Sequence, residues 1–364
     1  MPAPDAIPTK LTESLPALLK PLGISAGWNV SKLTGDASLR TYFRISAGEK
    51  KFVAMKLADT GFNSPAEEIT KTSREIKELP FIDVQKYLWA RKVRVPEIFG
   101  VDRERGVLLL EDFGDEILVE KVIAAPEHQV RLLYETSLDE LERISTIPKN
   151  DPRSCIAFAR KFDRDLYNWE FHHFVEYSLD KRLKRPPSSA DRQRIVLQLE
   201  GLTDRYLSWE FVFCHRDYHS RNLMLLSNGP KPKLGVIDFQ DALLAPLFYD
   251  LASLLRDSYV TLEPKLQDDL VEVYRQRMKK QNLMGTDSRD AFRRAFDFMG
   301  LHRNLKAAGR FCYIDQVKGN PRYLEAVPRS LAYVEGTLKR YPELKKLSEV
   351  LLPYLADLSR SCPK

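Results

Sequence analysis

The first part of the chain changes from a helical to a strand-like pattern of apolar positions. Leucines recur at helical spacing between Leu11 and Leu19, which predicts an amphipathic helix with Pro16 inside it. Short apolar segments bounded by polar residues and glycine follow, the second of them centred on Tyr42 and Phe43. These segments predict three strands, over 29–35, 40–46 and 51–57.

A helix and a further strand complete this part of the chain. The spacing of apolar residues predicts a helix over 81–89, and Val95-Pro96 marks the approach to another strand. The apolar run 106–110 predicts a buried strand, and the polar segment 111–114 predicts a linker after it. We therefore expect a small, sheet-containing lobe over residues 1–112 and a different architecture beyond it.

Beyond the linker, helical spacing of apolar residues dominates. One apolar run, 234–237, predicts a short strand that ends at Asp238, and the Pro-Pro-Ser-Ser stretch 186–189 marks a surface loop. A chain of 364 residues favours two lobes, so we expect a larger helical lobe over 113–364. Its helices are predicted to end near Pro148 and to cover 162–179, 262–281, 289–311 and 328–358.

Composition narrows the class of protein. Hydrophobic residues make up 43% of the chain and charged residues 30%, which is ordinary for a globular protein. The net charge of +6 is small for this length and no basic run is interleaved with aromatics, so we expect no nucleic-acid partner. No apolar run is long enough to span a bilayer and the start does not resemble a secretory signal. We expect a cytoplasmic monomer that binds small molecules and no membrane.

The four cysteines do not suggest a site of their own. None of them is paired at C-x-x-C spacing, so the sequence indicates neither a zinc site nor a redox pair. We expect reduced, mostly buried thiols at Cys155, Cys214, Cys312 and Cys362.

The stretch that begins at His215-Arg216-Asp217 has the most specific chemical pattern. Asn222 follows the aspartate by five residues, and Asp238 ends the predicted strand. Phosphoryl transfer from ATP needs a carboxylate beside the acceptor hydroxyl and two oxygen ligands for magnesium, and kinases supply these groups in this order. We therefore expect ATP and Mg²⁺ as cofactors, Asp217 as the catalytic base, and Asn222 and Asp238 as metal ligands.

The predicted third strand and the loop before it carry a second kinase-like pattern. The strand ends in Val-Ala-Met-Lys56, close to the kinase V-A-I-K, whose lysine holds the α- and β-phosphates. In the loop 35–39, the backbone of Gly35 and the hydroxyl of Ser38 are candidates for contact with phosphate oxygens. The alternatives are a solvated strand end for the lysine and a plain hairpin turn for the loop.

Together these motifs resemble the aminoglycoside phosphotransferase branch of the protein-kinase-like fold. Tyr218 and Gln240 stand where protein kinases usually have Leu after His-Arg-Asp and Gly after Asp-Phe. Within that branch, segments 215–224, 238–242 and 299–324 look like the bacterial kinases that phosphorylate N-acetylmuramate and N-acetylglucosamine at the anomeric hydroxyl. The resemblance implies a two-lobed α+β fold with the nucleotide between the lobes and the acceptor on the larger lobe.

The resemblance also implies residues that meet the nucleotide. A glutamate of the next helix should pair with Lys56. We expect this partner of Lys56 to be Glu75, although the spacing of Glu67, Glu68 and Glu78 suits the role equally well. Glu111 and Asp112 lie where the lobes should join and adenine should bind. Turn carboxylates without a nucleotide contact are the alternative for these two residues.

For the acceptor, the resemblance implies both carboxylates and basic residues. Glu170 and Glu176 occupy matching places of an acidic helix, and carboxylates suit sugar hydroxyls because their oxygens accept hydrogen bonds. Arg303 and Lys306 match the family, and we expect them near an acidic substituent such as a lactyl group. His219 is a further candidate for acceptor contact. Solvated helix faces are the alternative for the glutamates and for the basic pair.

Three residues are expected to support the site. The resemblance assigns Asp250 to the backbone N–H groups of the catalytic loop, Asp241 to the neighbourhood of the magnesium ion, and His215 to the loop itself. Helix capping is the alternative for both aspartates.

The sequence thus predicts an ATP-dependent kinase of an amino sugar's anomeric hydroxyl, an activity of cell-wall sugar recycling. One alternative is another alcohol acceptor, such as an aminoglycoside, a choline-like alcohol or another sugar. A non-catalytic binding protein of the same fold is the other alternative. The intact set Lys56, Asp217, Asn222 and Asp238 argues against it, because a binding relic would tolerate the loss of any of them.

Overall fold

Five antiparallel strands form the sheet of the small lobe. The computed structural model describes residues 7–33, 40–58, 78–149, 151, 155–284 and 288–363. The strand order is β1-β2-β3-β5-β4, so β5 pairs with both β3 and β4. The strands are β1 (Trp28–Lys32), β2 (Thr41–Ala47), β3 (Lys50–Lys56), β4 (Ile98–Asp102) and β5 (Val107–Glu111).

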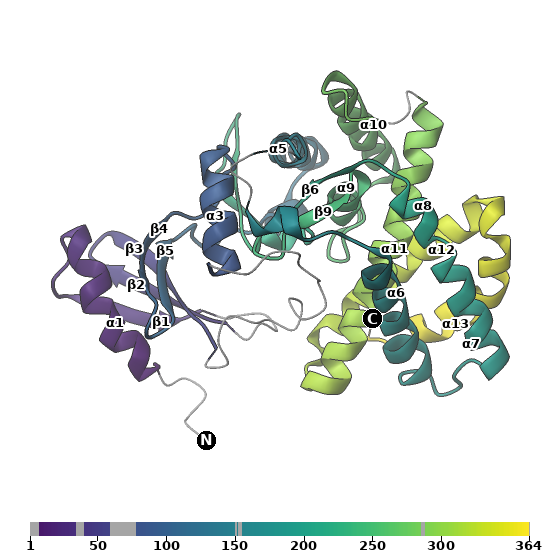
Figure 1. Ribbon diagram of the computed structural model, residues 1–364, viewed down its shortest axis with the longest axis horizontal. Coiled ribbons are helices and arrows are strands. Elements are labelled where there is room, and N and C mark those ends of the chain that lie inside the picture. The colour runs from purple at the N-terminus through teal and green to yellow at the C-terminus, as the bar shows by residue number, and fades with distance from the viewer. Residues whose placement is uncertain are drawn as a thin grey trace.

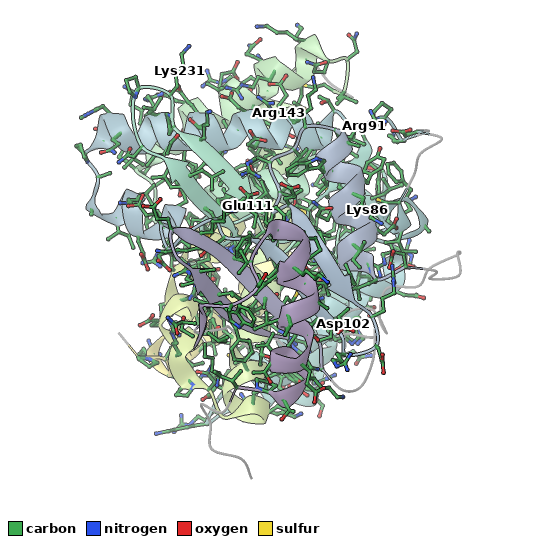
Figure 2. The ribbon with its side chains drawn as sticks, turned by 90° about the vertical axis from the view of Figure 1, so that its left-hand side faces the viewer. Lys86, Arg91, Asp102, Glu111, Arg143 and Lys231 are labelled. Carbon is green, nitrogen blue, oxygen red and sulfur yellow. The ribbon has the colours of Figure 1, made fainter. Side chains whose placement is uncertain are left out.

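The two faces of this sheet belong to different hydrophobic cores. The leucines of α1 (Thr9–Leu19) cover one face and share a cluster with Val107 and Leu109 of β5. Successive side chains of a strand point to opposite faces, so Leu108 and Leu110 pack on the other side, with α3 (Pro80–Ala90). In Figure 1, α1 lies at the outer end of the molecule and α3 faces the helical lobe. Figure 2 looks onto α1 with the sheet behind it.

The linker after β5 packs directly on the large lobe. Phe113 lies against Gly235 of β8 (Lys233–Val236), where an added Cβ would come within 2.3 Å of the Phe113 ring. The Arg94 guanidinium lies over the same ring, 4.7 Å from its centre. These contacts place the junction of the lobes next to the strand that leads into Asp238.

The large lobe is mainly helical (Figure 1), and its described residues contain two short antiparallel strand pairs. One pair joins β6 (Phe211–Cys214) with β9 (Leu243–Pro246), and the other joins β7 (Leu223–Ser227) with β8. The helices are α4 (Leu118–Ala124), α5 (Glu127–Ser145), α6 (Arg164–Phe174), α7 (Ser189–Glu200), α8 (Thr203–Leu207), α9 (Phe248–Leu255), α10 (Pro264–Lys280), α11 (Arg289–Lys318), α12 (Val327–Arg340) and α13 (Lys345–Arg360). The predicted two-lobed α+β fold is confirmed.

Helix α11 is the central element of this lobe and packs against α6, α9 and α12. Its backbone approaches α6 closely at Gly309, where an added Cβ would lie 2.7 Å from the Cα of Phe174. This crossing brings Glu170 of α6 close to Arg303 and Lys306 of α11.

Several element ends differ from the sequence prediction. The predicted helix 328–358 is two helices, because Pro342 has no N–H to donate and favours extended backbone at Tyr341 (φ −113°, ψ 112°). The predicted helix 162–179 begins at Arg164, after an Asp163 cap, and passes into a π-helix over Val175–Asp180. Helix α11 runs beyond residue 311 until Gly319, at φ +65°, ends it. In the part of the chain that the structure describes, no helix combines the length and apolar character that crossing a membrane requires.

Candidate active site

The loop predicted to carry catalysis follows β6, whose four residues are all buried. Arg216 in this loop has a left-handed backbone (φ +80°), which residues other than glycine rarely adopt. Asp238, after β8, has the same feature (φ +64°). Such strained conformations persist only where the surrounding structure holds them. At Arg216 the buried carboxylate of Asp250 does so.

Asp250 of α9 holds the first half of the loop. This carboxylate is 1% exposed and accepts hydrogen bonds from the backbone N–H groups of His215 at 2.6 Å and Arg216 at 3.0 Å. This is the contact with backbone N–H groups of the loop that we expected for Asp250 from the sequence. The Nε2–H of His215 donates to the carbonyl of Ile237 at 2.9 Å, which ties the loop to the segment that carries Asp238.

Asp257, which no sequence pattern singled out, holds the second half of the loop. It is 3% exposed and accepts hydrogen bonds from the backbone N–H groups of Ser220 at 2.9 Å and Tyr259 at 2.8 Å. The available signal was its place in a polar triplet directly after the apolar helix that carries Asp250. The loop therefore rests on two buried carboxylates from one segment of the chain.

Asp217, Asn222 and Asp238 come together at this loop. The Nδ2 of Asn222 donates to the backbone carbonyl of Asp217 at 2.8 Å and lies 3.5 Å from Oδ2 of Asp238. Because the amide nitrogen is used in this way, the Asn222 Oδ1 is the atom left to bind a cation. Gln240 donates to Asp238 at 2.9 Å and to Asp241 at 3.0 Å, so a further carboxylate lies beside the first two.

The charge balance at Asp238 fits a bound cation. Although the Asp238 side chain is exposed, desolvation by the surrounding protein raises the pKa of its carboxyl, and the nearby Asp241 and Asp217 raise that pKa further against the Gln240 hydrogen bond. No group of three or more His, Cys, Asp or Glu side chains able to hold a metal occurs among the described residues. Magnesium does not require such a cage, since it usually takes one or two carboxylates and completes its shell with phosphate and water.

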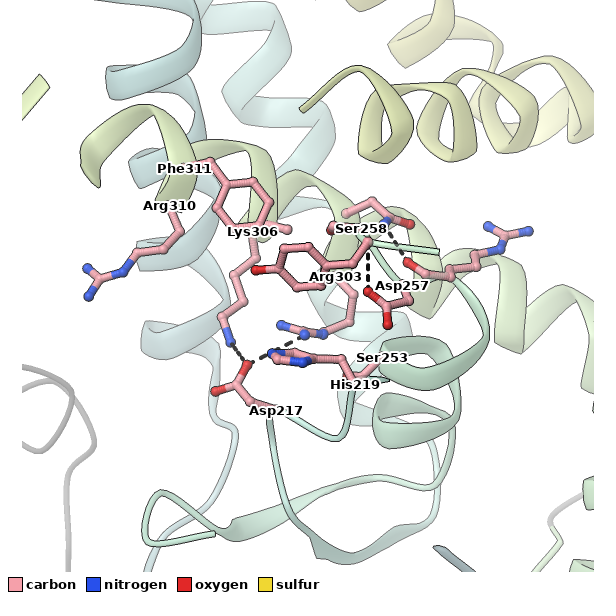
Figure 3. Close-up of a pocket in the computed structure, with 13 residues that line it drawn as sticks. Asp217, His219, Ser253, Asp257, Ser258, Arg303, Lys306, Arg310 and Phe311 are labelled. Atoms are coloured by element: carbon pink, nitrogen blue, oxygen red, sulfur yellow. Dashed lines mark hydrogen bonds and ion pairs between the residues drawn. The ribbon is translucent and has the colours of Figure 1, made fainter. Parts of the chain in front are cut away.

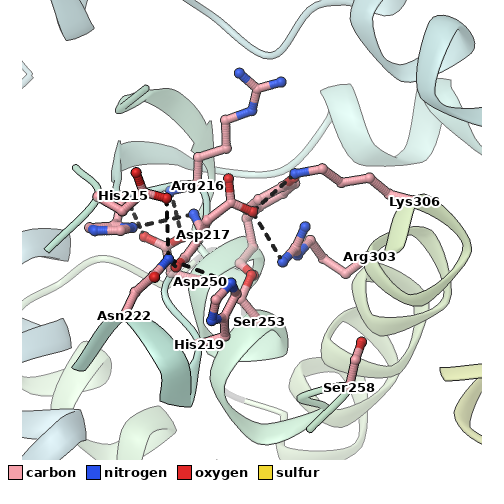
Figure 4. A network of polar contacts seen from close by, with 12 residues as sticks. His215, Arg216, Asp217, His219, Asn222, Asp250, Ser253, Ser258, Arg303 and Lys306 are labelled. Atoms are coloured by element: carbon pink, nitrogen blue, oxygen red, sulfur yellow. Dashed lines mark hydrogen bonds and ion pairs between the residues drawn. The ribbon is translucent and has the colours of Figure 1, made fainter. Parts of the chain in front are cut away.

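The Asp217 carboxylate opens onto a cavity of about 140 Å³ between the catalytic loop, the segment after α9 and α11 (Figure 3). One of its oxygens, Oδ1, lies 3.2 Å from Nζ of Lys306 and 3.5 Å from Nη2 of Arg303 (Figures 3 and 4). Burial alone would raise the pKa of Asp217, but Lys306, Arg303 and Arg216 outweigh it and hold that pKa well below its usual value. Asp217 therefore remains ionised. His219 also lines the cavity.

Glu170 forms the centre of a buried ionic cluster behind this cavity. It is 2% exposed, with Oε2 3.2 Å from Nε2 of His302 and Oε1 3.5 Å from Arg216 and 3.9 Å from Lys306. Burial opposes ionisation, but Lys306, His302 and Arg216 prevail and lower the pKa of Glu170 to about 2. Glu170 is not among the lining residues, and its link to the cavity is Lys306, which lines it.

Glu176 is not brought to this site. It lies on the π-helical segment, about half exposed, and pairs with Lys181 at 2.5 Å. It is absent from the residues that line the cavity, so the structure favours the alternative that Glu176 lies on a solvated helix face.

The residues predicted to meet the nucleotide lie mostly on the small lobe. Lys56 ends β3, is buried, and donates to the carbonyl of Leu57. The carboxylates of Glu111 and Asp112 form salt bridges with Arg94 and Arg44 respectively. Since these ion pairs occupy both carboxylates, the structure favours the alternative that Glu111 and Asp112 are turn carboxylates without a nucleotide contact. The further predicted residues Gly35, Ser38 and Glu75 lie outside the described residues.

The model of the phosphotransferase enzyme family matches residues 29–284, more than two thirds of the chain, which include Asp217, Asn222 and Asp238 but not Arg303 and Lys306 of α11. The chain belongs to this family. The family assignment from the sequence is therefore confirmed.

Two relatives show how far the similarity extends along the chain. The N-acetylmuramate/N-acetylglucosamine kinase of Neisseria meningitidis is 30% identical over 322 residues, which cover 88% of this chain and 89% of that protein. The kinase of the same name from Pseudomonas putida is 30% identical over 357 residues, which cover 96% of this chain and 97% of that protein. The similarity thus extends over both lobes.

Solved phosphotransferase structures share the fold at much lower identity. A choline/ethanolamine kinase family protein from Mesorhizobium loti superposes with a TM-score of 0.56 at 14% identity, over 96% of this chain and 98% of that one. An ADP-bound aminoglycoside phosphotransferase superposes with a TM-score of 0.54 at 12% identity, over 97% and 99% of the two chains. These similarities establish the protein-kinase-like architecture of this family member.

Proposed function

We propose that this phosphotransferase is an ATP-dependent kinase that transfers the γ-phosphoryl group to the anomeric hydroxyl of N-acetylmuramate and N-acetylglucosamine. The observation that carries the proposal is the position of Asp217, whose ionised carboxylate faces a cavity while its loop holds Asn222 against Asp238. Kinase chemistry requires these groups side by side. The names of the relatives in Neisseria and Pseudomonas support the acceptor.

In the proposed reaction, Asp217 accepts a hydrogen bond from the anomeric hydroxyl and orients its oxygen toward the γ-phosphorus. The sugar oxygen forms a bond to phosphorus, the bond between phosphorus and the β,γ-bridging oxygen breaks, ADP leaves, and the hydroxyl proton passes to the Asp217 carboxylate. A carboxylate of low pKa is a weak base, but phosphoryl transfer is loose and depends mainly on positioning. An anomeric hydroxyl is also more acidic than an ordinary sugar alcohol, so a single aspartate suffices.

The remaining roles follow from the arrangement of the site. Asn222 and Asp238 would hold Mg²⁺, which neutralises charge on the β- and γ-phosphates, with Asp241 beside them. Lys56, Gly35 and Ser38 would contact phosphates, and Glu75 would pair with Lys56. The nucleotide would lie between a lobe of residues 1–112 and a lobe of 113–364. We further propose a cytoplasmic monomer.

The structure suggests a different role for the basic pair than a direct contact with the sugar. Lys306 and Arg303 both lie against Asp217, so they would keep the catalytic carboxylate ionised and oriented. Glu170 would fix Lys306 from the other side.

Measurement of ADP release with a panel of acceptors tests the proposal. N-acetylmuramate and N-acetylglucosamine should give turnover that choline, an aminoglycoside and glucose do not match. Brisk turnover of one of those other alcohols would show that the protein is a kinase with a different acceptor from the one proposed. Turnover of none, with ATP bound, would favour the non-catalytic binding protein.

A further inference from the structure

Three arginines and one lysine line the proposed acceptor cavity among the described residues, and three of these four side chains already have carboxylate partners. Arg303 and Lys306 lie on Asp217, as described above. Arg256 pairs with the fully buried Asp297 and also donates to Thr337 at 2.8 Å. A ligand that drew any of these three away would break an ion pair within the protein.

The fourth side chain, that of Arg310, has no carboxylate partner among the described residues. No hydrogen bond or ion pair joins it to another described residue, and its guanidinium lies over the Tyr313 ring, 5.0 Å from the ring centre. The side chain is partly exposed. In Figure 3 the Arg310 side chain extends away from the Lys306–Asp217 pair. It is therefore a cation that a ligand can engage without breaking an internal ion pair.

The position of Arg310 along α11 relates it to the reacting end of the cavity. It follows Lys306 by four residues and Arg303 by seven, so the three side chains share one face of the helix. Each turn of a helix rises about 5.4 Å. Arg310 thus lies about one turn farther from Asp217 than Lys306 does.

The two proposed acceptors differ in one charged group. N-acetylmuramate carries a lactyl ether on C3, with a carboxylate, where N-acetylglucosamine has a hydroxyl. The C3 substituent is two ring carbons from the anomeric carbon, so its carboxylate points away from the reacting hydroxyl. An arginine beyond the catalytic end of the cavity matches this arrangement, because a guanidinium binds a carboxylate through two parallel hydrogen bonds.

We propose that Arg310 binds the lactyl carboxylate of N-acetylmuramate and sets the preference of the enzyme between its two acceptors. This assignment rests on the function proposed above. It replaces the sequence-based expectation that Arg303 or Lys306 meets the acidic substituent.

Steady-state kinetics with both sugars tests the assignment. In Arg310→Gln, the ratio of kcat/KM for N-acetylmuramate over N-acetylglucosamine should fall about tenfold, the low end for a charge-assisted hydrogen bond at a partly exposed site. Arg310→Lys keeps a charge but not the paired donors, so it should recover part of the ratio. The matched control is Arg294→Gln, which removes an exposed arginine of the same helix that pairs with Glu343, and it should leave the ratio as in the wild type.

A second measurement needs no variant. Added salt screens a partly exposed ion pair, so the wild-type ratio should fall as NaCl is raised from about 20 mM to about 0.5 M. An unchanged ratio in Arg310→Gln, or a wild-type ratio that is insensitive to salt, would overturn the role of Arg310 and leave the sugar kinase standing. If the wild type turns over neither sugar, the proposed function itself fails, and the assignment of Arg310 fails with it.

Discussion

One carboxylate oxygen of Asp217 pairs with both Lys306 and Arg303. These two cations therefore orient the carboxylate and also keep it ionised. Replacing Asp217 by Asn keeps the shape of the side chain but removes the acceptor for the hydroxyl proton. We predict that turnover of Asp217→Asn falls at least ~100-fold, the low end for the loss of general-base help, while ATP binding changes little. Rapid-quench kinetics and calorimetry measure the two quantities. Turnover close to that of the wild type would remove Asp217 from the mechanism.

Asp238 and Asn222 present hard oxygen donors to one place. Because Mg²⁺ would bridge these oxygens to the phosphates, we predict that Asp238→Ala loses the magnesium-dependent part of its ATP affinity. Calorimetric titrations with Mg²⁺ and with EDTA should differ for the wild type and coincide for the variant. Wild-type titrations that coincide would show that no magnesium joins protein and nucleotide.

Glu170 links the site to the stability of the fold. Its pKa is lowered from 4.5 to about 2, so the folded state favours its ionised form. That preference is worth about 3 kcal/mol, is fully present above pH 4.5, and is lost as the pH falls toward 2. Urea unfolding of the wild type and Glu170→Gln should therefore differ most at neutral pH and converge below pH 4.5. A difference that stays constant or grows in acid would contradict this account of the ionic cluster.

At the residue scale, sequence reasoning found the groups whose spacing is local and missed those defined only by the fold. Asp217, Asn222 and Asp238 lie in one stretch, and their order along the chain already indicates their chemistry. The polar triplet that contains Asp257 and the helical spacing that contains Arg310 do not by themselves place either residue at the site. Their positions follow from how α9 and α11 pack around the loop. Glu176 matched a family position, but the π-helical segment leaves it about half exposed with Lys181.

At the scale of elements, the site depends on the close crossing of α6 and α11. A methyl group at Gly309 would meet the Phe174 backbone at 2.7 Å, and a backbone cannot move aside as a flexible side chain does. We predict that Gly309→Ala destabilises the protein by about 1–3 kcal/mol, the range for an overpacked core, and lowers kcat because Lys306 moves relative to Glu170. Unfolding curves and turnover measure both effects.

Gly336 provides the matched control for that substitution. It is exposed within α12, and an added Cβ meets nothing within 4 Å. Gly336→Ala should therefore stabilise the protein by about 0.5–1 kcal/mol, the usual gain from replacing glycine inside a helix. Equal effects of the two substitutions would show that the crossing tolerates displacement.

The elements that sequence reasoning placed well are those with a clear period. The alternation in β5 separates Leu109 from Leu108 and Leu110, and the structure assigns them to the two cores. The break between α12 and α13 was missed because their shared apolar spacing hides the effect of Pro342. Helix ends depend on such single residues, whereas the existence of a helix depends on many.

At the scale of the whole molecule, two lobes meet beside one catalytic loop (Figure 1). The linker packs Phe113 on Gly235, and the strand that contains this glycine leads into Asp238. The predicted division of the chain into lobes follows from its change of periodicity near residue 112. The acceptor does not follow from the fold, because phosphotransferases of this architecture share it at 12–14% identity.

The central claim, an anomeric sugar kinase, is tested most directly by the product. The protein is incubated with ATP, Mg²⁺ and either N-acetylmuramate or N-acetylglucosamine, and the mixture is examined by phosphorus NMR. We predict a sugar 1-phosphate, recognised because its phosphorus couples to the anomeric proton. A 6-phosphate as the sole product, or no product from either sugar beside brisk turnover of another alcohol, would contradict the account.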